Sequence, residues 1–375
     1  MQRVIHRTVL PALLTLGACG GSGGDGAGNP GSPGTTPDSG SATSSDGAAG
    51  PDDAGVRVDG SSTDGAVVVQ DAGHGPAGDA AIEAAGPPDA AAGGTGPYGG
   101  SGPDTVTTSS LQVPAPNATF TTTAYIPSGP GPFPVVVLSS GFFQSGVAYA
   151  PYASRLASWG IVTLLRDDPN LGEATPSIVS DVQYTVGTWL ATTNADTSSA
   201  LHGAIDTSRV GLAGHSRGGQ IALLAGEALA GKIHGVFGLD PVDTSMNGSA
   251  EARTTLATIG VPVAFIGETT DSAASSCAPA TDNYQVLYQA AVSPAVAITS
   301  VNADHTMFED PASCFACTAC TPGTASQAQV MATAVRYLTA FFARQLLGDA
   351  TVGAAFQGAG ASQDVAAGRT QLVSK

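Results

Sequence analysis

The 375-residue chain has few basic side chains: 13 Lys and Arg stand against 30 Asp and Glu, which gives a net charge of −17 at pH 7. Proteins that bind nucleic acid need clustered Lys and Arg to neutralise phosphates. The sequence contains no such cluster, so this class of partner is excluded. Twelve of the acids lie in 19–104 together with a single arginine. The acidity therefore describes that segment and says little about a substrate.

The N-terminus lacks an apolar run long enough to remain in a bilayer as a helix. Two arginines precede the short apolar core 9–16, which is typical of a secretory signal peptide, placed here at 1–18. Leu, Gly and Ala precede Cys19, as in a bacterial lipobox, so Cys19 is the predicted lipid attachment site. A chance cysteine after an ordinary cleaved signal is the alternative. Gly20 stands where an aspartate would favour inner-membrane retention. We therefore expect an exported protein, either an outer-membrane or cell-surface lipoprotein held only by this anchor, or otherwise a secreted protein.

Segment 19–104 lacks large apolar residues and consists mainly of Gly, Ala, Ser, Pro and Asp. A chain of this composition cannot bury enough surface to offset the entropy of ordering it, so we expect a disordered tether. Residues 105–375 show no internal repeat and are numerous enough for one large folded domain.

Apolar runs and helical patterns alternate along 105–375. This alternation predicts an α/β fold with a mainly parallel central sheet and helices on both faces. Ligands of such sheets bind beyond the carboxyl ends of the strands. Thr324 and Gln327 have the spacing of a capping box for the last helix. The expected strands are 118–126, 133–139, 161–165, one ending at 214, 233–239, 261–267 and, as the last, 295–301; the expected helices are 149–159, 175–190, 221–230, 283–291 and 325–347.

A Gly-x-Ser-x-Gly motif at 214–218 joins a strand pattern to a helix pattern. This is the arrangement of a nucleophile elbow, which presents a serine at the apex of a strained turn. Gly214 and Gly218 suit such a turn because strand and helix pack too closely there to admit flanking side chains. The motif alone is a weak signal in a chain with 50 glycines, and its context strengthens it. We therefore expect a serine hydrolase with Ser216 as nucleophile.

A serine hydroxyl is a poor nucleophile at neutral pH and needs a base within hydrogen-bond reach. In elbow hydrolases the chain order is serine, acid, histidine, and two histidines follow Ser216. His234 stands at the amino end of a strand, away from the expected site. His305 lies in the loop after the last expected strand and is the predicted base, with a surface loop histidine as the alternative.

The acid that orients the histidine can come from the loop after either of two strands. Asp240 ends one strand, and Glu268 and Asp271 follow the next. Position alone leaves this choice open. Asp243 lies further into its loop, where a solvated or loop-capping role is favoured.

Two backbone N–H groups are needed to stabilise the oxyanion of an acyl-transfer reaction. The elbow fold takes one from the residue after the nucleophile, here Arg217, and one from the loop after an early strand, for which Phe142 is our choice. The side chains of Phe142 and Phe143 would wall an apolar substrate pocket, with His215 lining the elbow beside them. Ordinary core packing is the alternative for the two phenylalanines.

These motifs resemble those of the chlorophyllase branch of the α/β-hydrolase superfamily, including the Arg after the serine. The resemblance implies an α/β-hydrolase fold and an esterase with Ser216, Asp240 and His305 as its triad, which favours Asp240 as the acid. Ser140 stands where the family has a histidine, so chlorophyll is not implied as the substrate. The segments that carry the resemblance are 140–143, 214–219, 239–243, 276–279 and 304–305.

The early strand, the Gly-Phe loop and the C-terminal helix are also similar to those of bacterial cutinase-type and polyester hydrolases, a group that includes dienelactone-hydrolase-like esterases. In the cutinase-type enzymes the acid follows the later strand. That second similarity favours Asp271 as the acid.

Four cysteines remain once Cys19 is assigned to lipid, namely Cys277, Cys314, Cys317 and Cys320. An even number in an exported chain indicates two disulfides, with three possible pairings. A zinc site formed by all four is the alternative. Our hypothesis is that a disulfide joins Cys277 to one of the other three cysteines and holds the loop of the predicted base, His305, in place.

The sequence therefore predicts an exported serine esterase that hydrolyses carboxylic esters through an acyl-enzyme. No cofactor or metal is expected, and the partner is a small-molecule or lipid-like ester. A lipase or cutinase-type polyester hydrolase with Asp271 as acid is one alternative. A catalytically silent binding module of the same fold is the other.

Overall fold

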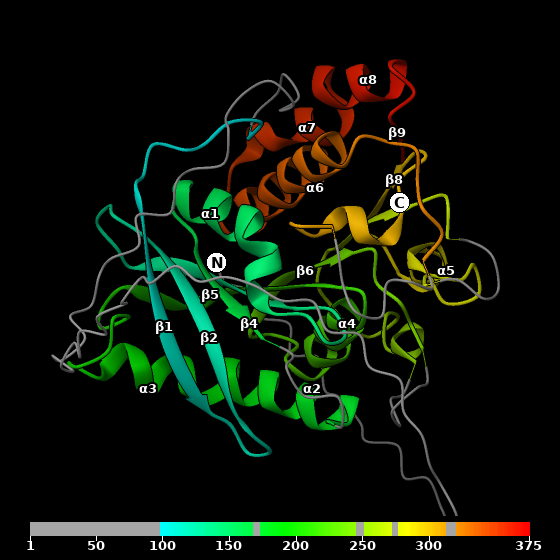
Figure 1. Ribbon diagram of the computed structural model, residues 1–375. Helices are drawn as coiled ribbons and strands as arrows, with labels where there is room; N and C mark the ends of the chain where they lie inside the picture. The colour runs from blue at the N-terminus through cyan, green and yellow to red at the C-terminus, as the bar shows by residue number, and fades with distance from the viewer. Residues whose placement is uncertain (1–97, 168–172, 245–250, 272–276, 313–319) are drawn as a thin grey trace, which may run out of the picture. The chain divides into compact units, whose positions relative to one another are not determined.

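The computed structural model describes residues 98–375, with the exception of 168–172, 245–250, 272–276 and 313–319 (Figure 1). The predicted signal peptide, the lipid site Cys19 and the tether up to residue 97 lie outside the described residues, as do Cys314 and Cys317. Within the described part of the chain, no helix has both the length and the apolar character needed to span a bilayer.

A nine-stranded sheet forms the centre of the fold, in the order β1-β2-β4-β3-β5-β6-β7-β8-β9. Neighbouring strands from β4 to β8 are parallel, whereas β1 and β2 at one edge and β9 at the other pair antiparallel. This confirms the predicted α/β fold with a mainly parallel sheet. The strands are β1 (Val106–Pro114), β2 (Thr119–Pro127), β3 (Phe133–Ser139), β4 (Val162–Arg166), β5 (Ile205–His215), β6 (Ile233–Leu239), β7 (Val263–Glu268), β8 (Ala295–Ser300) and β9 (Thr370–Ser374).

Helices cover both faces of the sheet, as predicted. They are α1 (Ala150–Ser158), α2 (Thr175–Tyr184), α3 (Leu190–Ala195), α4 (Arg217–Ala228), α5 (Tyr284–Ala290), α6 (Gln327–Phe342), α7 (Gly353–Gln357) and α8 (Ala359–Ala366). A π-helical turn, Thr185–Trp189, joins α2 to α3, so the predicted helix over 175–190 is part of one longer helical segment.

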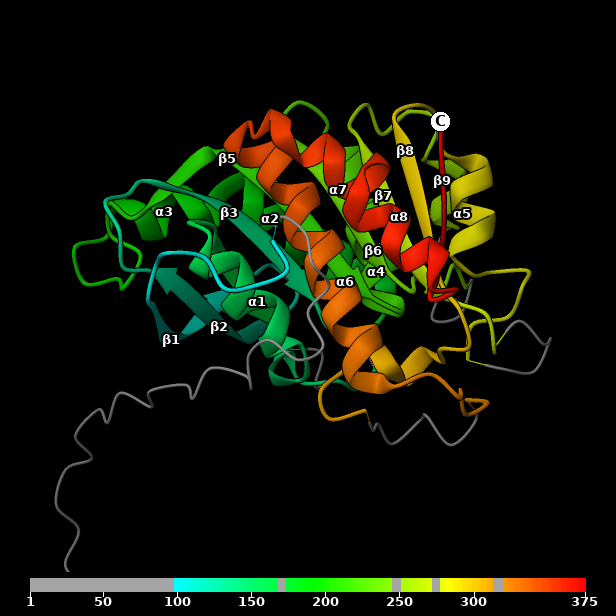
Figure 2. The same ribbon diagram turned by 90° about the horizontal axis from the view of Figure 1, so that it is seen from above.

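The inner strands are buried on both faces because their side chains point alternately into two apolar cores. In β3, Val136 and Leu138 belong to one core and Val135 and Val137 to the other. Helices α1 and α6 line the first core, and α2, α4 and α5 line the second (Figures 1 and 2). Full burial of one such side chain stabilises the fold by about 1.5–3 kcal/mol. The continuous apolar runs in the sequence therefore correspond to strands covered on both sides.

The last strand of the sheet is one that the sequence did not predict. Segment 295–301 corresponds to β8, but β9 pairs antiparallel with β8 and closes that edge of the sheet. Within β9, Thr370 is its sole buried residue, so the strand lacks the alternating apolar pattern that identifies a half-buried strand.

Helix α6 begins two residues later than predicted, and the expected capping box is not formed. Its N-cap residue, Ser326, makes no side-chain capping hydrogen bond. The N–H of Thr324 donates to the carbonyl of Asn302 at 2.9 Å, and Nε2 of Gln327 donates to the carbonyl of Glu309 at 2.7 Å. These contacts fasten the start of α6 to the loop after β8 and take the place of local capping.

Residues 98–104, which precede the predicted start of the folded domain, pack against α1. The ring of Tyr98 contacts Trp159 edge to face, with centroids 4.6 Å apart. Nη1 of Arg155 donates to the carbonyl of Tyr98 at 3.1 Å, and Nε1 of Trp159 donates to the carbonyl of Gly100 at 3.1 Å. These contacts could not be predicted from the sequence, because the segment is rich in glycine.

Candidate active site

Ser216 lies at the sharp turn between β5 and α4, as the elbow motif predicts. Its backbone has φ 55° and ψ −123°, a conformation that L-residues rarely adopt and that costs of order 1–3 kcal/mol. The surrounding backbone holds this conformation in place. The Ser216 N–H donates to the carbonyl of Leu239 at 3.1 Å, and the Ser216 carbonyl accepts from Gly219 at 3.0 Å.

The two glycines of the motif are required by close backbone contacts. A Cβ at Gly214 would lie 2.1 Å from the carbonyl oxygen of Gly218, and one at Gly218 would lie 2.2 Å from the carbonyl oxygen of Ser139. Both obstacles are backbone atoms, which cannot turn aside. The elbow therefore has no room for a side chain at positions 214 and 218.

His305 follows β8 and contacts Asp240, which follows β6. The distance from His305 Nδ1 to Asp240 Oδ2 is 2.6 Å, and the two residues are 5% and 0% exposed. Asp240 is itself fixed, because its N–H donates to the carbonyl of Ile266 at 2.6 Å. With Nδ1–H donating to the carboxylate, the second ring nitrogen, Nε2, is left to accept a proton.

The pKa of His305 is raised above its usual value of 6.5. Burial is the largest single influence and lowers this pKa. The hydrogen bond to Asp240 and the negative charges of Asp240, Glu309 and Asp271 raise it, and together they outweigh burial. The carboxylates around His305 therefore favour its protonated form.

Asp271, the alternative acid, holds the backbone beside His305 instead of its ring. Its Oδ2 accepts the N–H of His305 at 3.4 Å, and its Oδ1 accepts the N–H of Thr321 at 2.7 Å. Asp271 is fully buried. The two acids that position alone could not separate thus meet different parts of the histidine.

Glu268 lies behind these two acids at the end of β7. Burial, with the charge of Asp240 as the next cause, raises its pKa to about 8, so it holds its proton at neutral pH. Its Oε2 accepts the N–H of Asp271 at 2.9 Å and also that of Thr270. Glu268 therefore shapes the turn that carries Asp271.

Asp243 is a loop-capping residue, one of the two roles expected for it, but it is buried and not solvated. Its carboxylate accepts from Gln220 Nε2 at 3.2 Å and from Arg253 Nε at 2.8 Å. It is 1% exposed. The carboxylate is fully engaged in holding the loop after β6.

The predicted oxyanion residues lie in two segments that pack together. Phe142 belongs to the loop directly after β3, and the backbone of that loop reaches α4, since a Cβ at Gly218 would lie 2.4 Å from the Ser140 carbonyl oxygen. Arg217 is the first residue of α4, and the first turn of a helix directs its N–H groups outward along the axis. Both N–H groups therefore come from segments next to Ser216.

The side chain of Arg217 ties the Phe142 loop to the start of α2. Its guanidinium lies 5.2 Å from the ring centroid of Phe142, and it donates to Thr175 Oγ1 at 3.2 Å and to the carbonyl of Glu173. Phe142 and Phe143 contact each other edge to face at 4.4 Å and are half-buried. The two rings are thus held at the surface next to the elbow.

The sequence suggested that His215 lines the substrate pocket. In the structure it is instead buried beneath the site. It is 1% exposed, its ring packs on that of His305 with centroids 4.5 Å apart, and its Nδ1 contacts both Tyr149 and Glu309. Sequence analysis missed Tyr149 and Glu309. The one available signal was that Glu309 follows His305 by four residues.

Cys277 and Cys320 are joined by a disulfide that bridges the loops after β7 and β8. Cys314 and Cys317, the other two disulfide candidates, lie outside the described residues. A carboxylate oxygen of Asp271 lies within 4.8 Å of both sulfurs, but sulfurs in a disulfide are not available as thiolate ligands. The bridge instead fastens Thr321, and hence Asp271, beside the His305 loop.

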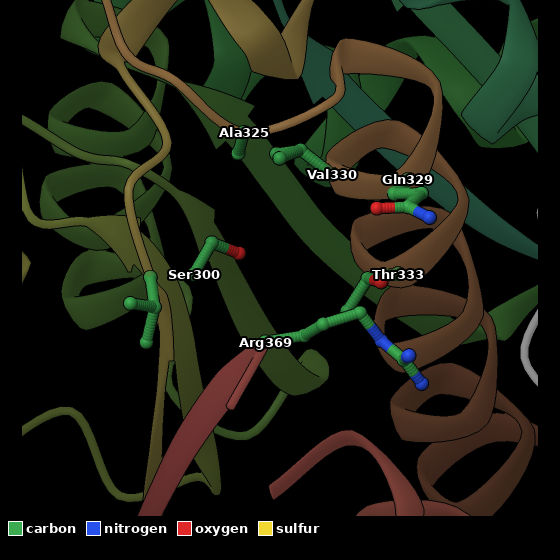
Figure 3. A pocket seen from close by; sticks show the side chains of 7 residues that line it. Ser300, Ala325, Gln329, Val330, Thr333 and Arg369 are labelled. Atoms are coloured by element: carbon green, nitrogen blue, oxygen red, sulfur yellow. The ribbon is translucent and has the colours of Figure 1, made fainter. Parts of the chain in front are cut away.

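A small cavity of about 40 Å³ lies between the end of β8, α6 and Arg369 (Figure 3). None of the predicted site residues is among those that line it. It is therefore not part of the candidate active site.

The chain is similar to a known protein family. The model of a family described as Chlorophyllase matches residues 100–360, a range that contains Ser216, Asp240 and His305. No curated protein matches the chain.

Proposed function

The chain belongs to the chlorophyllase family, within the α/β-hydrolase superfamily, and we propose that it is a serine esterase that hydrolyses carboxylic esters. The family supports a hydrolase. The observation that carries the finer proposal is the 2.6 Å contact between Asp240 and His305, next to a serine at a strained elbow.

In the proposed mechanism, Ser216 Oγ attacks the ester carbonyl carbon while its proton passes to His305 Nε2. The Asp240 carboxylate holds Nδ1–H and stabilises the imidazolium that forms. The negative charge on the former carbonyl oxygen is held by the N–H groups of Phe142 and Arg217.

Collapse of this intermediate breaks the bond to the alcohol oxygen, which leaves with the proton from Nε2. Ser216 is then acylated. A water molecule attacks the acyl carbon and gives its proton to Nε2, and the second collapse returns that proton to Ser216 Oγ as the carboxylic acid departs. No cofactor takes part in these steps.

We propose Asp240 and not Asp271 as the acid of the triad. The contact of Asp240 is to the ring nitrogen that must be oriented, whereas that of Asp271 is to the backbone N–H. This difference disfavours the cutinase-type alternative, in which Asp271 would be the acid.

The proposed substrates are esters with an apolar group, since Phe142, Phe143 and Val147 give the loop beside the site an apolar surface. Val147 is 66% exposed, and Phe142 and Phe143 are half-buried. Chlorophyll is not proposed, because Ser140 replaces the family's histidine. Export and a lipid at Cys19 are further proposals, supported by the sequence alone.

The test is turnover of p-nitrophenyl esters of several acyl lengths by the purified protein, with Ser216→Ala as the matched control. The proposal expects hydrolysis by the wild type and a loss of kcat of roughly a millionfold in the variant. A folded wild type without turnover of any of these esters would favour the binding module.

A further inference from the structure

We propose that Tyr149, His215 and Glu309 form a buried brace that positions the oxyanion loop and the His305 loop relative to each other. None of the three is assigned a part in the proposed reaction, and the inference rests on that proposed function. All three side chains are almost completely removed from water: Tyr149 is 0%, His215 1% and Glu309 1% exposed. Most buried polar side chains in proteins are hydrogen-bonded, and these three contact one another.

His215 joins the brace to the catalytic histidine. Its Nε2 lies 3.1 Å from the carbonyl oxygen of His305. A carbonyl oxygen can only accept, so Nε2 must carry a proton. The two imidazole rings also pack on each other in a tilted arrangement, with centroids 4.5 Å apart and planes inclined by 34°. A shift of His215 would therefore move both the backbone and the ring of His305.

Tyr149 joins the brace to the oxyanion loop. Its hydroxyl oxygen accepts the N–H of Gly141 at 3.0 Å, and Gly141 precedes Phe142, whose N–H is proposed to stabilise the oxyanion. The same hydroxyl lies 2.9 Å from His215 Nδ1. Burial and the nearby charge of Glu309 raise the pKa of Tyr149 well above its usual value, so the hydroxyl keeps its proton and can donate.

Glu309 closes the cluster from the other side. Its Oε1 lies 3.2 Å from His215 Nδ1 and 3.4 Å from the Tyr149 hydroxyl. Nδ1 of His215 therefore faces both the Tyr149 hydroxyl, which can donate to it, and the Glu309 carboxylate.

Gly141 also packs closely against the brace. A Cβ at Gly141 would lie 3.1 Å from both His215 Nδ1 and the Tyr149 hydroxyl. The oxyanion loop thus rests directly on the brace. A continuous path runs from Gly141 through Tyr149 and His215 to His305, and it links donors for the oxyanion with the base that moves the proton.

A misplacement of about 1 Å in such a site can reduce the rate by roughly a hundredfold. Tyr149→Phe removes the hydroxyl and keeps the ring, so we expect kcat to fall by roughly 10- to 100-fold with little change in KM. Tyr152→Phe is the matched control. Tyr152 lies in α1, which begins directly after Tyr149, and is fully buried; its hydroxyl donates to the carbonyl of Phe308 at 3.0 Å and not to a residue of the brace.

In Glu309→Gln, the pH dependence of kcat/KM should change, which a purely structural role of Glu309 would not cause. The charges that face His305 are those of Asp240, Asp271 and Glu309, and each raises its pKa. Loss of the Glu309 charge should shift the rising limb of kcat/KM against pH to lower pH. This variant also carries the test if Tyr149→Phe does not fold.

The experiment measures kcat, KM and the pH profile for the wild type and the three variants with a p-nitrophenyl ester, after circular dichroism has verified folding. A kcat in Tyr149→Phe equal to that of the wild type, an equal loss in Tyr152→Phe, or an unmoved limb in Glu309→Gln would overturn the brace alone. A folded wild type without turnover would overturn the proposed function and the brace with it.

Discussion

The carboxylate of Asp240 lies 2.6 Å from Nδ1 of His305, although 65 residues separate the two in the chain. They extend from β6 and β8, which are not neighbours, and the intervening β7 ends in Glu268. The parallel sheet brings their carboxyl ends to one edge, where a base and its acid meet.

Asp240→Asn should lower kcat by roughly 10⁴-fold, because an amide cannot hold the imidazole in the required tautomer or stabilise the imidazolium. Asp271→Asn should cost no more than about a hundredfold, since Asp271 contacts the backbone N–H of His305 and not its ring nitrogen. Steady-state kinetics of the two variants side by side check this. The reverse order would transfer the role of acid to Asp271.

The pH dependence of kcat/KM should report the raised pKa of His305. The base acts only when it is deprotonated, so the rate should rise with pH through a midpoint above 6.5. In Asp240→Asn the lowering effect of burial remains and the main raising effect is lost. The midpoint of the residual activity should therefore move to lower pH, and a midpoint that stays in place would contradict this account.

Glu268 should make the fold less stable as pH rises. Its pKa is raised from 4.5 to about 8 by burial and the charge of Asp240, so the folded state binds more protons than the unfolded state between these values. Its contribution is complete below about pH 4.5 and is lost as pH rises through about 8. The slope for one proton is at most about 1.4 kcal/mol per pH unit, reduced where water screens the charge.

Urea unfolding of Glu268→Gln at several pH values tests this loss. The variant should show a flatter decline than the wild type between about pH 5 and pH 8. Glu251→Gln, which removes a carboxylate whose side chain is 46% exposed, is the control and should leave the slope unchanged. Parallel curves for Glu268→Gln and the wild type would show that Glu268 is ionised throughout.

Gly214→Ala should destabilise the fold by about 3 kcal/mol or more, because its Cβ would meet the Gly218 carbonyl oxygen at 2.1 Å. Gly187→Ala is the matched control. Gly187 is exposed within the helical segment after α2, and the nearest atom to its Cβ position is Lys232 Nζ at 3.6 Å. That change should be neutral or stabilise by up to about 1 kcal/mol. Thermal unfolding of both variants distinguishes a crowded elbow from a tolerant one.

The strands and the elbow could be predicted because their signals are local. Each buried parallel strand is a continuous apolar run, and the motif around Ser216 combines a strand pattern, two glycines and a helix pattern within a few residues. The antiparallel edge strands β1 and β9 were both missed, because each depends on pairing with one neighbour, β2 or β8, and not on an apolar run of its own.

The choice between Asp240 and Asp271 could not be made from position alone, because both lie at the ends of buried strands on the same edge of the sheet. Asp240 meets the ring and Asp271 the backbone N–H of His305, a difference that arises only when the loops after three strands fold together. The brace was likewise invisible, since Tyr149, His215 and Glu309 are brought together by three separate segments.

The most direct test of the central claim is to react the folded protein with a fluorophosphonate probe and to map the labelled peptide by mass spectrometry, with Ser216→Ala treated in parallel. The proposed mechanism predicts stoichiometric label on Ser216, loss of ester hydrolysis as labelling proceeds, and no label in the variant. Folded wild-type protein that remains unlabelled, or that carries the label on another residue with ester hydrolysis intact, would contradict it.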